Sequence, residues 1–321
     1  MERSFSATQA RRDEEKVAVS VSSEYLQTIY QRLSLITVLL PLLGTIVAIA
    51  LLPFAPIGIS EVALFIVFYI LSMVGVEVGY HRYFSHRSFQ ANKSVQALLA
   101  ILGSMAAQGG VIFWVAHHRR HHQYTDQERD PHSPHLHGDN FWGQLRGFWH
   151  AHLGWVLEGE ISNSALFAKD LLRDPLISSI NRLQQIWVLL GLLLPAMING
   201  LILGTWIGFL QGLLWGGLVR IFVGQQVINA TNSICHMFGS RPFQSGDQST
   251  NNVWLAIPSI GQSWHNNHHA FPSSAVTGLE WWQIDIGTWF IRGFEQLNLV
   301  TNVKRPSAKM ITNKLELPAE S

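Results

Sequence analysis

Charged side chains and cysteines are scarce in this chain of 321 residues. Charged residues make up 13% of it and apolar residues 48%, whereas a soluble domain carries about 25% charged residues. This deficit indicates a membrane protein. The single cysteine, Cys235, excludes an internal disulfide framework, a cysteine-based zinc knuckle and an iron–sulfur cluster held by four cysteines. The net charge of +1 gives no indication of a nucleic-acid partner.

Four long apolar stretches each approach the roughly 20 residues that a helix needs to cross a bilayer. They form two pairs joined by short turns, around Pro53–Pro56 and Gly204–Thr205, so each pair is predicted to be an antiparallel hairpin. Neither turn contains Lys or Arg. Because basic residues favour the cytoplasm, both termini and the long middle segment are predicted to face it. The expected spans are residues 33–52, 59–78, 186–203 and 206–227.

The segments outside these spans are expected to play different roles. Residues 1–30 are polar and mixed in charge, without the apolar core of a signal peptide, and are predicted to form a flexible cytoplasmic tail. The apolar stretch Ser94–Ala107 is too short to cross the membrane and is expected at the interface or in the protein core.

Histidine is unusually abundant, with fifteen in the chain, and eight of them gather in three short motifs. The motifs HRRHH and WHNNHH share the spacing i, i+3, i+4, which places three imidazoles on one face of a helix. In HRYFSH the spacing is i, i+5, which does not share a face on an ideal helix, but these two can converge if a helix ends between them, as expected at a membrane exit. The two hairpins bring all three motifs to the same side of the membrane. The eight residues are His81, His86, His118, His121, His122, His265, His268 and His269.

Chance clustering is the alternative interpretation, but three dense motifs on one predicted membrane face argue against it. Imidazole is a ligand for Zn, Cu, Fe and Ni. Eight imidazoles are too many for one tetrahedral zinc site, so the motifs predict two metal ions. Composition alone leaves the identity of the metal open.

These motifs resemble those of the membrane fatty-acyl desaturases of the stearoyl-CoA and bacterial Δ9 type. The resemblance extends to the motifs TDQERDPHSP, GFWHAHLGW, TNSICHMFGSRPF and GQSWHNNHHAFP. The resemblance covers about Ser72–Lys309 and implies an all-α integral membrane fold, with four transmembrane helices and a cytoplasmic helical cap that holds two iron ions. It assigns residues 31–310 to one desaturase domain, followed by a C-terminal tail, residues 311–321. The implied reaction uses O2 to introduce a cis double bond, expected at Δ9, into a saturated acyl chain.

The resemblance also implies roles for single residues. His236 joins the eight histidines above as a ninth iron ligand, and Asn232 matches an asparagine that holds one iron through a water molecule. Tyr69 and Met73 match positions where side-chain bulk limits acyl length, although ordinary lipid-facing packing is an equal alternative. Glu77, one helical turn before His81, is expected to orient that imidazole or to reach interfacial water.

The resemblance defines the electron donor and the acyl carrier less completely than it defines the site residues. No haem-binding or flavin motif and no fused cytochrome b5 sequence is present, so the resemblance implies a separate ferredoxin or cytochrome b5 as electron donor. The stretch Val156–Glu160 is acidic where animal acyl-CoA enzymes carry basic residues, although Arg119 and Arg120 are candidates to contact a phosphate. The acyl carrier therefore stays open between CoA, acyl carrier protein and a membrane glycerolipid, as do chain length, double-bond position and oligomeric state.

Two other functions compete with desaturation. Membrane hydroxylases and acetylenases carry the same histidine motifs. A non-enzymatic metal carrier is the alternative from another class, but transporters place ionisable ligands near the bilayer midplane, whereas these histidines lie outside the predicted spans.

Overall fold

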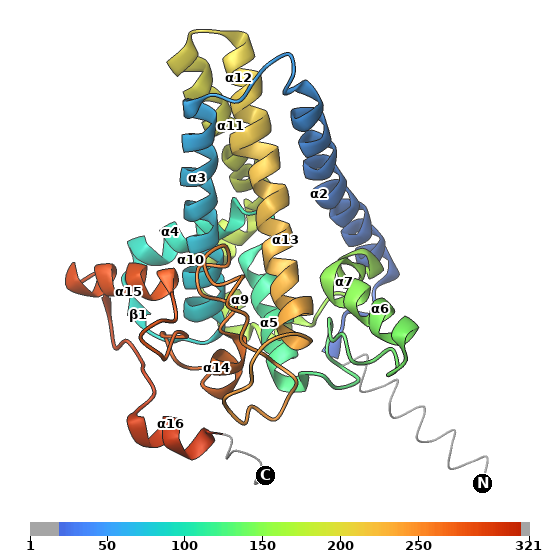
Figure 1. Ribbon diagram of the computed structural model, residues 1–321, viewed down its shortest axis with the longest axis vertical. Coiled ribbons are helices and arrows are strands. Elements are labelled where there is room, and N and C mark those ends of the chain that lie inside the picture. Colours follow the sequence, from blue (N-terminus) through green and yellow to red (C-terminus); the bar gives the residue numbers. More distant parts are fainter. Residues whose placement is uncertain (1–18, 316–321) are drawn as a thin grey trace.

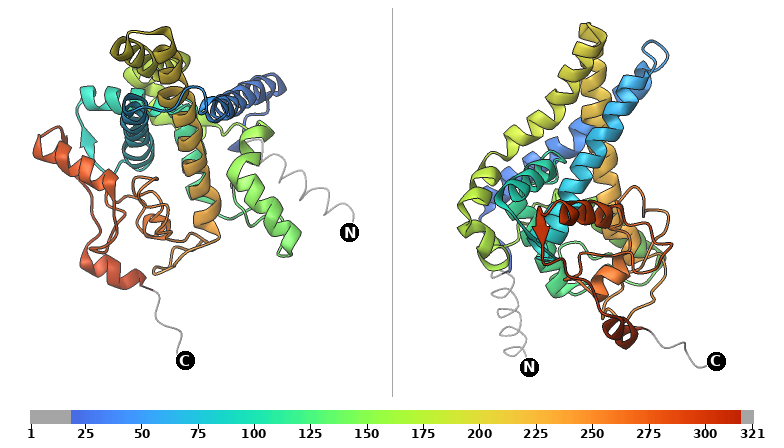
Figure 2. Two further views of the ribbon diagram at one scale, coloured as in Figure 1. Left: turned by 45° about the horizontal axis from the view of Figure 1, so that its top comes forward. Right: turned by 90° about the vertical axis from the view of Figure 1, so that its left-hand side faces the viewer.

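The computed structural model describes residues 19–315. Four helices are long and apolar enough to cross a membrane, and they extend together from one end of the molecule (Figure 1). The shorter helices and loops of residues 86–183 and 237–315, which we call the cap, gather at the other end (Figures 1 and 2). Both described ends of the chain lie on the cap side (Figure 1).

The expectation of four helices long and apolar enough to cross a membrane is confirmed, and these helices overlap the four predicted stretches and are longer than expected. The extension that ends at Ser85 is buried, but hydropathy does not detect it because its residues are polar. The first hairpin consists of α2 (Glu24–Leu51) and α3 (Ile59–Val74), which continues into η1 (Gly75–Ser85). The second consists of α11 (Gln184–Leu203) and a composite helix of α12 (Trp206–Gly212), η3 (Leu213–Val219), α13 (Arg220–Ser233) and η4 (Ile234–His236).

Part of the predicted N-terminal tail is attached to the cap. The Val21 amide donates to the Ile161 carbonyl at 2.8 Å, and the Asn163 amide donates to the Val19 carbonyl at 2.9 Å. α2 then begins at Glu24, within the expected tail. The rest of that tail, residues 1–18, lies outside the described residues, as do residues 316–321 of the C-terminal tail. Within the described part of the C-terminal tail, residues 311–314 belong to α16.

The turns of η1 are wider than those of an α-helix, and this explains the spacing of the first histidine motif. The His86 amide donates to the carbonyl of His81, five residues earlier, at 3.2 Å. Residues five apart therefore face the same way, and the two imidazole centroids lie 5.0 Å apart. As expected from the sequence, the helix also ends between them, at Ser85.

The remaining helices surround these hairpin ends. α4 (Lys93–Ser104) contains most of the apolar stretch expected at the interface or in the core, and its Leu99 and Ala100 are fully buried. It crosses η1 so closely that a Cβ on Gly75 would collide with the backbone of Gly103. The cap also contains α5 (Val111–Tyr124), α6 (Phe141–Trp149), η2 (His150–Gly154), α7 (Trp155–Glu158), α8 (Ser164–Phe167), α9 (Lys169–Arg173), α10 (Pro175–Arg182), α14 (His265–Ala270), α15 (Ile286–Gln296) and α16 (Ala308–Lys314). Strands β1 (Gln90–Ala91) and β2 (Val300–Thr301) pair antiparallel, with Gln90 opposite Thr301.

A buried arginine ties η1 to the cap. The Arg82 side chain is fully buried, and its guanidinium lies 2.8 Å from Glu77 Oε1 and 2.8 Å from Asp285 Oδ1. It also donates to the Ala275 carbonyl and to Thr288 Oγ1. A buried cation is stable only when it is paired and hydrogen-bonded, and these contacts meet both conditions. They fix the end of η1, and with it His81, against the start of α15.

Candidate metal centre

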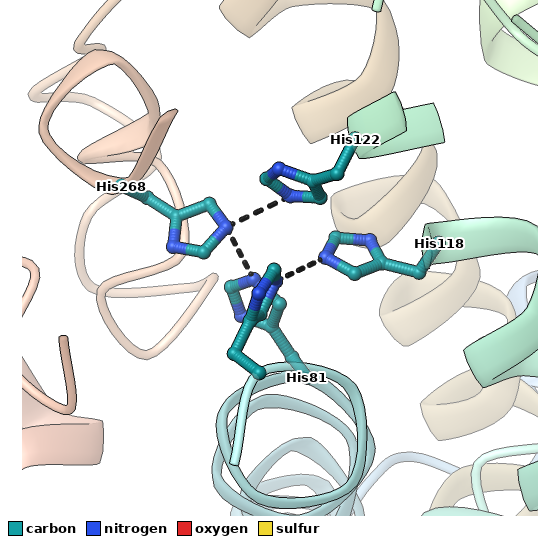
Figure 3. Close-up of side chains that lie close together, drawn as sticks. His81, His118, His122 and His268 are labelled. Atoms are coloured by element: carbon teal, nitrogen blue, oxygen red, sulfur yellow. Dashed lines mark hydrogen bonds between the residues drawn. The ribbon is translucent and has the colours of Figure 1, made fainter. Parts of the chain in front are cut away.

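The structure brings together all nine histidines that the sequence singled out, and divides them into two groups. Their ring nitrogens lie within 4.8 Å of one another in each group. Figure 3 shows four rings of the first group pointing toward one another from η1, α5 and α14. The first group is His81, His86, His118, His122 and His268, and the second group is His121, His236, His265 and His269.

The spacing on α5 and α14 explains this division. Residues four apart on a helix differ by about 40° in direction, whereas residues three apart differ by about 60° the other way. Accordingly His118 and His122 both belong to the first group, while His121 faces the second. On α14 the same spacing places His265 and His269 in the second group and His268 in the first. Each i, i+3, i+4 motif therefore contributes to both groups.

Four carboxylates fix imidazoles of the two groups. Glu77 Oε2 lies 2.6 Å from Nδ1 of His81, the orienting contact considered for it from the sequence. An Nδ1–H that donates to a carboxylate leaves the Nε2 lone pair free to bind a metal. The same contact joins Asp130 to His121 at 2.9 Å, Asp126 to His236 at 3.2 Å and Asp247 to His269 at 2.7 Å.

The charges of these carboxylates and imidazoles are set by burial and by each other. Burial alone would raise the pKa of Asp130, but the adjacent His121 lowers it to about 2. Burial and the neighbouring imidazoles hold the pKa of His118 and of His268 well below the usual value. Burial likewise lowers the pKa of His269 to about 4, despite its contact with Asp247. These three imidazoles are therefore neutral at pH 7, the form that binds a metal.

The residues present fit two metal ions. His121 Nε2 and His269 Nε2 are buried and have no hydrogen-bond partner, and an unpaired buried polar atom is unfavourable. In the first group, Nε2 of His268 lies 3.0 Å from Nε2 of both His81 and His122. A cation at the centre of each group would satisfy these converging lone pairs. Several imidazoles and no thiolate in either group suit Zn, Cu, Fe or Ni, so iron is among the metals that this ligand set fits.

The two groups differ in charge and in exposure. Three carboxylates, Asp126, Asp130 and Asp247, support the four imidazoles of the second group. In the first group Glu77 supports one of the five imidazoles, and Glu77 is itself neutralised by Arg82. The second group is therefore the more negative environment. Two of the nine histidines are half-buried, at positions 86 and 122, and both belong to the first group.

Replacing Asp126 by Asn is expected to weaken metal binding by the second group about 10- to 100-fold, because a supporting carboxylate raises the basicity of its histidine. Asn accepts the left-handed backbone of this position, where φ is 58°, so the fold is preserved. A chelator titration that follows both metals measures the effect, with Asp139→Asn as the exposed control. Loss of both metals from the variant at the same chelator concentration as from the wild-type protein would contradict this prediction.

Asn232 lies beside the second group. It is half-buried and lines a cavity of about 30 Å³ together with His118, His121 and His265. A cavity of this size holds one water molecule, and Asn232 is therefore placed where a water-mediated contact to a metal is possible.

Several histidines outside the two groups support them or lie at the surface. The His132 ring packs on the His121 ring with centroids 4.3 Å apart. His135 Nε2 lies 2.7 Å from the His236 carbonyl, and His152 contacts Ser233 Oγ. His121, Asp130 and His132 also lie close enough together to hold a metal. Since Asp130 already binds His121 Nδ1, this trio serves the second group and we assign it no separate ion.

Arg119 and Arg120, considered from the sequence as phosphate contacts, are already paired. The Arg119 guanidinium contacts both carboxylate oxygens of Asp170, at 2.6 and 3.1 Å. Arg120 is buried and lies 2.8 Å from Glu160. Both side chains join segments of the cap to α5, and the acidic Glu160 noted in the sequence is the partner of one of them. These pairings occupy the groups that were considered for a phosphate.

A larger cavity of about 430 Å³ leads toward the metal centre. It lies between α2, α5, α11 and α13, and it shares Gln108, Phe113 and Trp155 with the small cavity beside Asn232. Tyr69 and Met73 line neither cavity. Met73 is buried and packs close to Gly224, one turn of α13 before Ile228, which lines the small cavity.

Sequence reasoning missed three of the supporting carboxylates. Asp126 and Asp130 stand in the motif TDQERDPHSP, directly after the second histidine motif, and Asp247 precedes the third by eighteen residues. A signal was available for the first two, because an acidic residue close to a histidine motif is a candidate to orient one of its imidazoles. Asp247 carries no such local signal.

Comparisons with known proteins agree with this site. The family model described as "Fatty acid desaturase" matches residues 61–296. The chain is 50% identical over 297 residues to the hex-5-enoyl-[acyl-carrier protein] acetylenase of Moorena producens (strain JHB), covering 92% of each chain. It is 40% identical to Delta-9 acyl-lipid desaturase 2 of Arabidopsis thaliana, covering 82% of this chain and 81% of that one. It is 36% identical to the sn-1 stearoyl-lipid 9-desaturase of Anabaena variabilis, covering 81% of this chain and 90% of that one. The chain therefore belongs to the membrane fatty-acyl desaturase family and is an oxidoreductase.

Proposed function

We propose that this protein binds two iron ions and uses O2 to introduce a cis double bond, expected at Δ9, into a saturated fatty-acyl chain. The observation that carries the proposal is the position of the two histidine groups beside a small cavity that joins a larger, mostly apolar one. The first group would hold one iron. The second group would hold the other, with Asn232 acting through a water molecule.

Removing hydrogen from an unactivated methylene pair exceeds what side-chain acids and bases achieve, and bound iron with O2 would supply that oxidising power. The chain's own residues do the rest. The carboxylates keep the imidazoles in one orientation. The cavity walls position the acyl chain and exclude water, and this positioning selects the carbon pair. O2 would become two waters by taking two hydrogens, with their electron pair, from the acyl chain, one electron pair from an external donor and two protons from the solvent.

Topology and partner follow from the same arrangement. Both described ends and the cap lie on one side of the four helices (Figure 1), and the turns on the other side carry no Lys or Arg. This favours a multi-pass membrane protein with the cap and both termini in the cytoplasm. A ferredoxin or cytochrome b5 would deliver electrons there, at the half-buried His86 and His122.

Met73 is the proposed end of the acyl site, because it is buried and packs close to Gly224, one turn of α13 before Ile228, which lines the small cavity. Shortening this side chain is expected to lengthen the preferred acyl chain by about two carbons, the space that the removed atoms leave. Product profiles of Met73→Ala across a series of acyl lengths measure the shift. Met197→Ala, on the exposed face of α11, is the matched control, and a profile identical to wild type for Met73→Ala would reject this role.

Acetylenase activity is the second candidate, because a relative named for it is 50% identical over nearly the whole chain. In that case the substrate would already carry the double bond, and the same hydrogen removal would convert it to a triple bond. A hydroxylase would instead add oxygen.

Expression in a host that lacks its own desaturase, followed by analysis of its acyl chains, separates these functions. Saturated and monounsaturated chains are offered in parallel. A new double bond in the saturated chain supports the proposal, and a triple bond formed only from the unsaturated chain supports the second candidate. Added oxygen identifies a hydroxylase, and unchanged chains in an iron-loaded protein supplied with electrons reject all three.

A further inference from the structure

A closed loop of the cap, between Asn252 and Ser263, carries large apolar side chains on its outer surface. Two hydrogen bonds close it, from the Asn252 amide to the Ser263 carbonyl at 2.9 Å and from Ser263 Oγ to the Asn252 carbonyl at 2.7 Å. Trp254 is 87% exposed and Ile257 is 58% exposed, whereas Ile260 of the same loop is buried. An ordered loop that turns apolar side chains outward indicates a contact surface.

A hydrogen bond to α3 gives the depth of this loop. Tyr69 Oη donates to the Pro258 carbonyl at 2.8 Å. Tyr69 lies about 15 Å along the helix axis from Ile59, the first residue of α3, whereas the hydrocarbon core of a bilayer is about 30 Å thick. The exposed side chains of Ile70 and Leu71 continue the lipid-facing surface of α3 beyond Tyr69 toward the cap. Pro258 therefore lies beside a part of α3 that is inside the bilayer, although its loop belongs to none of the four spans.

Exposed tryptophans lie on the segment next to this loop. The Gly287 amide donates to the Ile260 carbonyl at 2.9 Å, which joins the loop to the start of α15. Trp281, just before α15, is 94% exposed, and Trp289 within it is exposed as well. α15 lies beside the cap-side part of the α3–η1 helix (Figures 1 and 2). Tryptophan is enriched where a bilayer meets water, because its ring is apolar and its N–H finds a polar partner there. These side chains fit the headgroup level of the leaflet beside the loop.

We propose that the loop between Asn252 and Ser263 enters the cap-side leaflet of the bilayer, with Trp254 and Ile257 in contact with lipid acyl chains. The protein would then contact the membrane through a part of its cap as well as through its four membrane helices. This inference rests on the membrane placement given under the proposed function and is independent of the proposed reaction. The loop closes two residues before His265, so lipid contact would also fix the start of α14 relative to the bilayer.

Cysteine labelling tests this contact, because the one native cysteine, Cys235, is buried. Trp254→Cys and Ile257→Cys are labelled with a nitroxide, and the full chain is reconstituted in phosphatidylcholine vesicles. Relaxation of each label is compared between O2, which concentrates in the bilayer, and a water-soluble nickel chelate. Ile66→Cys, on the exposed face of α3, is the control for lipid. Lys309→Cys, exposed in α16 at the end of the molecule away from the membrane helices (Figure 1), is the control for water.

Both loop labels should relax more with O2 than with the chelate, as the label at position 66 does, and the label at position 309 should do the reverse. Loop labels that behave like the one at position 309 would overturn the inference and leave the proposed membrane placement standing. Loop labels shielded from both reagents would identify a covering protein chain in place of lipid and would also overturn it. A label at position 66 that lies in water would instead reject the membrane placement itself, and the inference with it.

The native side chain of Trp254 gives a second measurement that needs no label. Lipids brominated in their acyl chains quench the fluorescence of tryptophans that contact them, and iodide quenches the fluorescence of tryptophans in water. Trp254→Phe should reduce the emission that brominated lipids quench and leave the emission that iodide quenches unchanged. The opposite pattern would place Trp254 in water and overturn the contact.

Discussion

Replacing His121 by Ala is expected to reduce product formation at least about 100-fold, because loss of a mere supporting partner already costs 10- to 100-fold. His121 is buried, Asp130 fixes its Nδ1, and its Nε2 faces the second group without another partner. The second group has four imidazoles, so losing one removes a quarter of its protein nitrogen ligands. The first group keeps all of its members.

The measurement combines product analysis with metal content. The His121→Ala protein should retain the metal of the first group while it loses that of the second, and His137→Ala, at an exposed position, should match wild type in both. Wild-type turnover by the His121→Ala variant would show that His121 is not part of the metal centre. Loss of product with both metals fully retained would show that His121 acts in another way.

Replacing Asp285 by Asn is expected to lower the free energy of unfolding by about 3–5 kcal/mol, the effect of breaking a buried ion pair by removing one partner. Arg82 would remain fully buried with Glu77 as its one carboxylate partner among the described residues. Glu77 also holds His81, so the damage should reach the first group. Equilibrium unfolding in detergent measures the loss, with Glu280→Gln in the preceding exposed loop as control.

The same pair predicts a dependence on pH. Burial would raise the pKa of Asp285, but Arg82 lowers it to about 2, below the unfolded value of about 3.9. A group with a depressed folded pKa stabilises the protein above its unfolded pKa, and this contribution is lost as pH falls from about 4 to about 2. The variant lacks that contribution at every pH, so its difference from wild type should shrink across this range. A difference that stays constant down to pH 2 would contradict the assignment.

The sequence predicted the four spans and eight of the nine histidines, because both depend on local patterns, whereas His236 was identified only through the resemblance to the desaturases. Span length and apolar composition are properties of a continuous stretch, and imidazole spacing follows helix geometry. The ends of the spans were less predictable. The last residues of the second helix, including His81 and Arg82, are polar and buried, so hydropathy placed the end of this helix too early.

Two of the four carboxylates that contact the histidines, Asp126 and Asp247, were harder to predict, because they lie far along the chain from the imidazoles that they contact. Glu77 and Asp130 lie only four and nine residues from theirs. Asp126 and His236 are 110 positions apart, and Arg82 and Asp285 are 203 apart. No local pattern contains such pairs, and only the packing of the cap creates them. The same limit explains why Arg119 was considered for a phosphate: its partner, Asp170, lies 51 positions away. The division of each motif between two groups followed from helix geometry once both helices were placed.

The central claim is that nine histidines in two groups hold two iron ions. Elemental analysis of protein purified without oxygen, together with iron K-edge absorption, tests it most directly. The account predicts two irons per chain, coordinated by imidazole nitrogen and without sulfur. One iron per chain, or two zinc ions that iron does not displace in a protein active without iron, would contradict it.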